Sequence, residues 1–358
     1  MTGPDTVASR LIAWWRISGR KTLPWQEDPS PYRVWVSEIM LQQTQVAAVL
    51  PYFRAFMTRF PDLDALAQAP LDEVLHRWSG LGYYARARNL HVAARIVRDR
   101  FGGKLPEDLP SLMELPGIGR STAGAIVALA HGQCAAILDG NARRVLARCF
   151  AVAGHPGETV TARRLWKLSE SLVPDADVTA YTQALMDLGA TVCTRGRPRC
   201  DACPLEAVCT AHAAGCETDY PSPRPRRRRP VRRTRVVLAV DGEGAVLLER
   251  RAAQGIWGGL WALPEIGDDG DASAWCATRF GSAPDAVEEW PPVRVVFTHF
   301  ELDIRPALVR VAAAPAQVLE PDRWVWYNTT TPATLGLPAP VARLIARIPT
   351  MSPSCPAP

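Results

Sequence analysis

Apolar residues recur at three- and four-residue spacing from Pro4 to about Gly215, with proline or glycine at the breaks. This spacing lines one face of a helix with apolar side chains, so it predicts a mostly α N-terminal part. The clearest predicted helices are Pro31–Gln45, Leu71–Trp78, Ala85–Arg100, Ser121–Ala130, Ala142–Ala153, Ala162–Ser171 and Tyr181–Leu188.

The pattern changes after a proline- and arginine-rich tract, PSPRPRRRRPVRRT, that follows Tyr220. Like charges and prolines keep such a tract extended, so it predicts a linker. Beyond it, the β-branched runs RVVLAV and AVLLER flank the turn signal Asp241-Gly242-Glu243-Gly244, which predicts a sheet-containing α+β domain. We therefore expect a helical domain at 1–216, a linker at 217–234, an α+β domain at 235–348 and a disordered tail at 349–358.

The composition limits the class of protein but does not by itself indicate a function. Among 358 residues, 47% are hydrophobic and 22% are charged, the balance of a globular protein. The net charge of +5 is compatible with a polyanionic partner but does not require one. The N-terminus, MTGPDTVASRLIAWWR, has no basic leader with an apolar core, and no apolar run is long enough to cross a bilayer. We expect a cytoplasmic protein, without membrane attachment, that acts as a monomer.

Four of the nine cysteines lie close together in the chain, with the spacing C-x6-C-x2-C-x5-C. They are Cys193, Cys200, Cys203 and Cys209, and four thiolates at this spacing can converge on one [4Fe–4S] cluster. Zinc also accepts four thiolates, but its sites usually contain two short knuckles, and the second one is missing here. Arginines within the loop 193–209 suggest that it contacts phosphates, with an architectural role for the metal.

A second motif, LPGIGRSTAGAI, places Gly117 and Gly119 in a tight turn before a helix that should begin at about Ser121. Such a turn can offer backbone N–H groups to a phosphate. Many helical hairpins need glycines only to turn, so both interpretations stay open from the residues alone.

Two carboxylates stand out beside these motifs. Glu38 lies among apolar residues, so it is either a partly desolvated general acid or an ordinary solvated helix residue. Asp139 follows an apolar run and precedes a helix, which by itself predicts an N-cap. Periodicity does not decide between these alternatives.

The order of hairpin, Asp139 and cysteine cluster resembles the endonuclease III and MutY superfamily of DNA glycosylases, in particular the MutY-type adenine glycosylases. The resemblance is sharpest in VSEIMLQQTQV, GLGYYARARNL, LPGIGRSTAGAI and LDGNARRVLAR. It implies a helix-hairpin-helix core, a six-helix barrel joined to a cluster domain that includes the N-terminal helix. It also implies one [4Fe–4S] cluster and duplex DNA as the partner.

The resemblance further implies roles for individual residues. Glu38 protonates the adenine ring, Asp139 stabilises the oxocarbenium-like state, and Asn141 helps to orient the site. Gln42, Gln43 and Tyr83 are candidates to fill or hold open the gap left by a flipped base. From the residues alone, Tyr83 and its neighbour Tyr84 could equally be packing aromatics.

Ser121 occupies the position at which strand-cutting relatives carry a lysine that forms a Schiff base with the sugar. We therefore expect a monofunctional glycosylase that leaves an abasic site.

The segment GIWGGLWALP is similar to the Nudix-like C-terminal domain of MutY proteins, which recognises 8-oxoguanine. The acidic helix that a Nudix hydrolase needs for Mg²⁺ is missing. Phe297, Thr298 and His299 lie in a predicted strand, and the resemblance places them in the region that touches the oxidised guanine.

These features together predict removal of adenine paired with 8-oxoguanine or guanine. One alternative is a glycosylase of the same fold with another mismatch or oxidised-base specificity. Others are a non-catalytic protein that scans DNA and a Mg²⁺-dependent hydrolase of free oxidised nucleotides. Ser121, the two carboxylates and the missing acidic helix weigh against these alternatives.

Overall fold

The computed structural model describes residues 4–223, 228–311 and 322–348. The chain divides into two compact units, one formed by residues 1–68 and 89–226, the other by residues 69–88 and 227–358. The segment 69–88, expected to belong to the helical domain, thus groups with the C-terminal sheet. The tail expected at 349–358 lies outside the described residues. None of the described helices has the length and apolar character needed to span a membrane.

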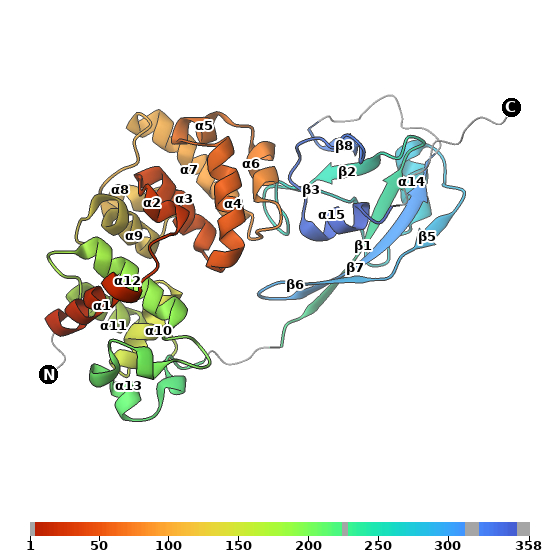
Figure 1. Ribbon diagram of the computed structural model, residues 1–358. Coiled ribbons are helices and arrows are strands. Elements are labelled where there is room, and N and C mark those ends of the chain that lie inside the picture. The colour runs from red at the N-terminus through yellow and green to blue at the C-terminus, as the bar shows by residue number, and fades with distance from the viewer. Residues whose placement is uncertain (1–3, 224–227, 312–321, 349–358) are drawn as a thin grey trace. The chain divides into compact units, whose positions relative to one another are not determined.

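The described chain up to residue 223 is helical, as the spacing of apolar residues predicts (Figure 1). Its α-helices are α1 (Pro4–Ser18), α2 (Pro24–Glu27), α3 (Pro31–Leu41), α4 (Val46–Arg59), α5 (Leu63–Gln68), α6 (Leu71–Trp78), α7 (Ala85–Phe101), α8 (Leu109–Met113), α9 (Arg120–His131), α10 (Gly140–Cys149), α11 (Thr159–Ser171), α12 (Val178–Thr191) and α13 (Thr210–Ala213). Short 3-10 helices are η1 (Cys200–Ala202), η2 (Glu206–Val208) and η3 (Glu217–Asp219).

Two groups of buried side chains hold the helical unit together. Helices α3 and α4 bury aromatic residues. The rings of Phe56 and Phe60 are in edge contact, with their centroids 4.8 Å apart. Helices α1, α10, α11 and α12 share a second core, against which the cysteine loop packs, and its members include Leu11, Leu146, Leu165 and Leu188. The N-terminal helix therefore shares a core with the cysteine loop.

Two predicted helices end earlier than their apolar spacing suggests. Helix α3 ends at Leu41 instead of residue 45, because Gln42 leaves the helical conformation and Gln43 adopts a left-handed one with φ of 58°. Helix α10 ends at Cys149, and Ala151 has a φ of 45°. In both places a local backbone reversal overrides the periodicity.

The C-terminal part forms a mixed sheet of β1 (Val231–Val240), β2 (Val246–Arg250), β3 (Trp261–Ala262), β4 (Glu265–Gly267), β5 (Val287–Glu289), β6 (Val293–Val296), β7 (Glu301–Arg310) and β8 (Trp324–Tyr327). The order is β3-β2-β1-β7-β5, with β4 on β1, β6 on β7 and β8 on β2. Strands β1 and β7 run parallel along their whole length. Since β1 begins at Val231, the sheet starts within the segment expected to be linker.

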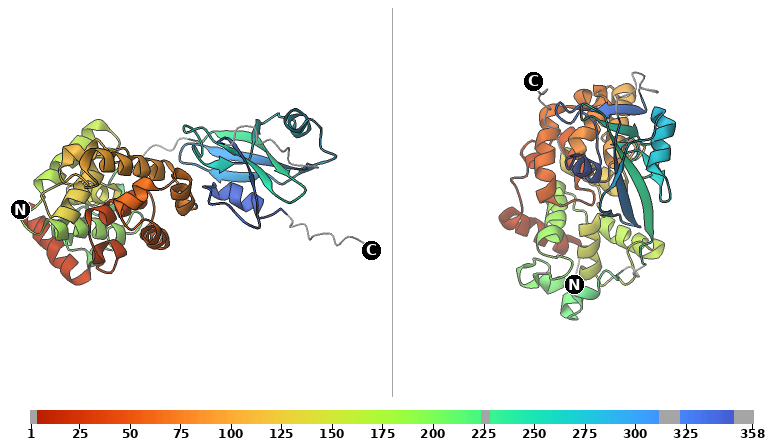
Figure 2. Two further views of the ribbon diagram at one scale, coloured as in Figure 1. Left: turned by 90° about the horizontal axis from the view of Figure 1, so that it is seen from above. Right: turned by 90° about the vertical axis from the view of Figure 1, so that its right-hand side faces the viewer.

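Alternate residues of β1 face opposite sides of the sheet, because side chains in a strand have a period of two. Val236, Leu238 and Val240 pack in a core that includes α15 (Ala339–Ile345). Val237 and Ala239 pack in a second core with α14 (Ala272–Phe280). The sheet is therefore covered by one helix on each face (Figure 2).

One detail of this part differs from the sequence-based expectation. Phe297, Thr298 and His299 are not in a strand but in the turn between β6 and β7. The acidic residues that follow Pro264 precede α14, which has Asp271 as its N-cap. No acidic residue lies inside α14, so the helix offers no carboxylates to a metal ion.

Candidate active site and cysteine cluster

Helix α3 positions Glu38. The helix starts at the N-cap Ser30 with Pro31 in its first turn, and most of its side chains are buried. Glu38 itself is half-buried. Desolvation, and secondarily the charge of Asp139, raise the pKa of Glu38 from 4.5 to about 8. A carboxyl group with this pKa is protonated at neutral pH and can donate a proton.

Asp139 has the N-cap geometry that its position predicts. Its Oδ1 accepts a hydrogen bond of 2.8 Å from the backbone N–H of Ala142 at the start of α10. The positive end of the helix dipole suits an ionised carboxylate there. The electrostatic interaction between Asp139 and Glu38 means that the fold brings the two carboxylates to one site. Asp139 can therefore be both the N-cap of α10 and a residue of the active site.

The segment before Asp139 is held by side chains of two other helices. The Ser121 hydroxyl in α9 accepts a hydrogen bond of 2.9 Å from the N–H of Leu138. The Ser169 hydroxyl in α11 donates to the carbonyl of Ile137 at 2.6 Å. These contacts fix the backbone next to Asp139, and they give Ser121 a positioning role that the sequence did not reveal.

The turn between α8 and α9 requires its first glycine. Gly117 has a φ of 84°, and a Cβ added there would lie 2.9 Å from the Cβ of Asn89. Gly119 is the N-cap of α9. The Gln42 amide donates to the carbonyl of Gly117 at 3.4 Å, so the end of α3 is joined to this turn. The N-terminal N–H groups of α9 lie beside it, as a phosphate site requires.

Two of the residues expected to enter the base stack have a strained backbone. Gln43 is exposed with a φ of 58°, and Tyr83 has a φ of 50° with 49% of its surface exposed. Left-handed conformations of such residues cost energy and often occur at functional sites. Tyr84, in contrast, is buried, as expected of a packing aromatic, whereas Tyr83 is half-exposed and contacts the Arg86 guanidinium and the Thr298 hydroxyl.

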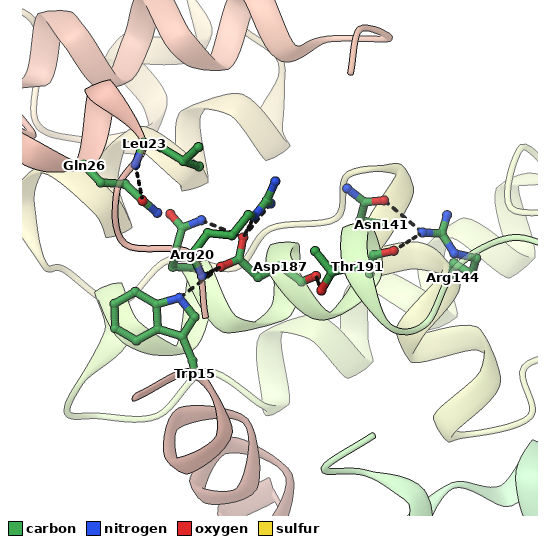
Figure 3. Close-up of polar contacts among 10 residues, drawn as sticks. Trp15, Arg20, Leu23, Gln26, Asn141, Arg144, Asp187 and Thr191 are labelled. Carbon is green, nitrogen blue, oxygen red and sulfur yellow. Dashed lines mark hydrogen bonds and ion pairs between the residues drawn. The ribbon is translucent and has the colours of Figure 1, made fainter. Parts of the chain in front are cut away.

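Asn141 connects the site to the cysteine loop through an arginine that the sequence analysis missed. Arg144 donates to Asn141 Oδ1 at 2.9 Å and to the carbonyl of Gly189 at 2.6 Å (Figure 3). Its Nε donates to the carbonyl of Cys193 at 2.7 Å. A single guanidinium thus ties α10 to the end of α12 and to the first cysteine.

Asp187 in α12 is a further buried carboxylate (Figure 3). It accepts hydrogen bonds from the Trp15 indole at 3.1 Å and from the Arg20 Nε at 2.9 Å, and Arg20 also forms an ion pair with it. These contacts fix the chain that leaves α1. In the same region the Gln26 side chain accepts from the N–H of Leu23 at 3.3 Å and caps α2.

The four predicted metal ligands line one pocket between α10, the end of α12 and the loop that follows, and they are Cys193, Cys200, Cys203 and Cys209. Among the described residues, three possible ligand atoms lie within 4.8 Å of one another only at Cys200, His212 and Glu217. All three of these residues also line the pocket.

Two thiols of this pocket have a raised pKa. Burial raises the pKa of Cys203 to about 12 and that of Cys200 to about 11, where Glu217 contributes as well. Such thiols stay protonated at neutral pH until a metal displaces the protons. Glu217 accepts from Cys200 at 3.6 Å and lies 2.5 Å from His212 Nδ1, so both residues surround the ligand set without having been predicted.

In the C-terminal unit, the turn at residues 297–300 presents polar side chains to solvent. The N–H of Phe297 donates to the carbonyl of Phe300 at 2.9 Å, and the two rings stack with centroids 4.6 Å apart. Thr298 and His299 between them are exposed. The stacked rings give the turn a fixed base, and the Thr298 hydroxyl at its tip lies 3.4 Å from the hydroxyl of Tyr83.

The chain matches two family models. Residues 36–171 match the HhH-GPD superfamily of base excision DNA repair proteins, and residues 235–347 match the NUDIX domain. Among solved structures, a thermostable thymine-DNA glycosylase is similar with a TM-score of 0.54 and 28% identity, over 59% of this chain and 97% of that one. The helical fold of a non-covalent endonuclease III–DNA complex is also similar, with a TM-score of 0.51.

The relatives most similar in sequence share one name. An adenine DNA glycosylase of Buchnera aphidicola is 35% identical over 94% of this chain and 95% of its own length. The Homo sapiens adenine DNA glycosylase is 45% identical over 56% of this chain and 38% of its own length. With the paired carboxylates, the hairpin and the C-terminal NUDIX domain in place, the chain belongs to the adenine DNA glycosylase family of base excision repair enzymes.

Proposed function

We propose that this protein hydrolyses the N-glycosidic bond of adenine paired with 8-oxoguanine, or with guanine, in duplex DNA. The observation that carries the proposal is the pair formed by Glu38 and Asp139. Its two carboxylates have different environments, since Glu38 is desolvated with a pKa of about 8 and Asp139 caps a helix. A protonated and an ionised carboxyl group at one site are what acid-assisted cleavage of a glycosidic bond requires.

In this mechanism Glu38 donates its proton to a ring nitrogen of the flipped adenine. The glycosidic electron pair then leaves with the neutral base, and positive charge develops on the sugar. The carboxylate of Asp139 stabilises that charge. Water adds to the sugar carbon and loses a proton, which leaves an abasic site and free adenine. Ser121 offers no amine, so the reaction stops before strand cleavage.

Binding to DNA uses the turn at Gly117 and Gly119 together with the N-terminus of α9, which present N–H groups to a phosphate. Gln43 and Tyr83 enter the base stack, because their exposed side chains stand on strained backbone that holds them away from the core. Gln42 connects Gln43 to the phosphate-binding turn, since its side-chain amide donates to the carbonyl of Gly117 in that turn.

The cysteine loop holds one [4Fe–4S] cluster through Cys193, Cys200, Cys203 and Cys209. The convergence of these four cysteines on a common pocket supports this assignment. When bound, the cluster supplies four iron–thiolate bonds that cross-link the loop. Arg144 donates hydrogen bonds to both this loop and Asn141, so the position of Asn141 at the active site depends on the loop.

The C-terminal domain recognises the base opposite adenine through Phe297, Thr298 and His299. Exposed polar side chains at the tip of a turn, with a stacked aromatic pair beneath, suit contact with a modified base. Hydrolysis of free nucleotides is not expected, since α14 carries no acidic residue.

The test is single-turnover release of adenine from duplexes that contain A:8-oxoguanine, A:G or A:T pairs, with a thymine-glycol duplex alongside. We expect release to be fastest from the oxidised pair, slower from A:G and absent from the other two. Equal rates on A:8-oxoguanine and A:G would contradict the role of the C-terminal turn. Excision of thymine glycol would favour a different specificity of the same fold.

A further inference from the structure

Arg148 in α10 is one of the few charged side chains that are almost fully buried, with 2% of its surface exposed. Its guanidinium donates to the Cys193 Sγ at 3.3 Å, to the carbonyl of Thr194 at 2.7 Å and to that of Arg195 at 3.0 Å. Its Nε donates to the carbonyl of Tyr220 at 3.0 Å. Every acceptor thus belongs to the cysteine loop or to the segment that follows it.

The charge of Arg148 has no carboxylate partner among the described residues, since all of these acceptors are carbonyls or sulfur. A guanidinium stays protonated in proteins, and an unpaired buried charge is costly. Arg20, in contrast, is paired with the buried carboxylate of Asp187. Arg148 therefore requires a negative charge from a source other than Asp or Glu.

The position of Arg148 indicates that source. Its side chain lines the pocket together with the four predicted ligands. It contacts the sulfur of Cys193 directly, and its own carbonyl lies 3.5 Å from the sulfur of Cys209. A cluster ligated by four thiolates carries net negative charge, and the potential of such a cluster depends on nearby charges and on hydrogen bonds to its sulfurs.

We propose that Arg148 is the buried counter-cation of the iron–sulfur cluster, and that it sets how firmly the cluster is retained and at what potential it is reduced. The proposal rests on the proposed cofactor. Arg148 is a positioning residue in this role, since it acts through Cys193 and does not reach the carboxylates of the active site. Its positive charge stabilises the more negative, reduced cluster, so removing that charge makes reduction harder.

A purely structural role makes a different prediction. If Arg148 only supplied hydrogen bonds to the loop carbonyls, its replacement would loosen the loop without a regular effect of charge on the potential. Lysine and glutamine separate the two roles, because Arg148→Lys keeps the charge and Arg148→Gln removes it, while both lose the planar fork of five donors. Arg54→Gln, at an exposed position in α4, removes the same charge from the surface and serves as the control.

The experiment measures, on the full-length holoprotein, the reduction potential of the cluster by protein-film voltammetry and the release of iron to a chelator. For Arg148→Gln we expect a more negative potential and iron release about 10- to 100-fold faster, the usual scale for a lost contact to a metal ligand. For Arg148→Lys and Arg54→Gln we expect the potential of the wild type. Equal potentials of Arg148→Lys and Arg148→Gln would overturn the proposal.

If Arg148→Gln does not fold, the potential of Arg148→Lys compared with that of the wild type is the test of the proposal. A wild-type potential in that variant supports the counter-cation, and a clear shift contradicts it. Failure of the proposed cofactor is seen separately, since the wild type would then lack iron and the absorption of a [4Fe–4S] cluster. Failure of the proposed activity is seen in the adenine-release assay, which uses no electrochemistry.

Discussion

Replacing Glu38 with glutamine should change how the stability of the protein depends on pH. In the folded protein the pKa of Glu38 is raised from 4.5 to about 8 by desolvation and by Asp139. Between these two values the folded chain keeps a proton that the unfolded chain has released. The wild type therefore loses stability as pH rises through this window, and the loss is complete above about pH 8.

The size of the effect follows from the same shift. A pKa change from 4.5 to about 8 corresponds to roughly 5 kcal/mol at about 1.36 kcal/mol per pH unit. Because the Glu38 side chain is only half-buried, we expect about 1–3 kcal/mol to be measured. Glu38→Gln has no proton to lose there. Relative to the wild type, the free energy of unfolding of Glu38→Gln should therefore increase by about that much as the pH is raised from 5 to 9.

The assay is urea denaturation of wild type and Glu38→Gln at both pH values, followed by tryptophan fluorescence. Glu107→Gln, at an exposed position, is the matched control and should show no such gain. A stability difference between Glu38→Gln and wild type that is the same at pH 5 and pH 9 would refute the assignment of Glu38 as a buried acid. The wild-type rate of adenine release should also fall above about pH 8, since the proton donor is then ionised.

Three further substitutions test other parts of the structure. Ser121→Ala leaves the N–H of Leu138 without its acceptor, so we expect a loss of about 1–2 kcal/mol in urea denaturation and slower adenine release. Gly117→Ala introduces a Cβ at a left-handed position, and fluorescence anisotropy should detect weaker binding to duplex DNA in a protein with a lower melting temperature. Asp187→Asn leaves the partly buried Arg20 without its ion-pair partner and should cost about 2–4 kcal/mol, and an unchanged urea midpoint would contradict this role.

Local sequence patterns predicted the elements that depend on neighbouring residues. The helix at 71–78 and the hairpin around Asp241 follow from spacing and turn chemistry, and both are present in the structure. The N-cap at Asp139 was predicted for the same reason. The end of α3 was not, because the reversal at Gln43 opposes the apolar spacing that continues into α4.

The contacts that connect the active site to the cysteine loop could not be predicted in this way. Arg144 and Arg148 lie in the arginine-rich helix α10, and most of their acceptors are backbone carbonyls more than forty residues away. Every residue has a backbone carbonyl, so the residue types of a sequence do not indicate which carbonyl accepts a hydrogen bond. Asp187 was missed for a related reason, since its partners Trp15 and Arg20 come from the opposite end of the helical unit.

The proposed role of Glu38 is to donate the proton that releases adenine. This role is tested most directly by measuring free adenine under single-turnover conditions from a duplex with one A:8-oxoguanine pair, for wild type and Glu38→Gln. We predict rapid release by the wild type, and a rate at least about 100-fold lower for Glu38→Gln with duplex binding retained. Release by Glu38→Gln at the wild-type rate, or no release by a wild type that binds the duplex, would contradict the account.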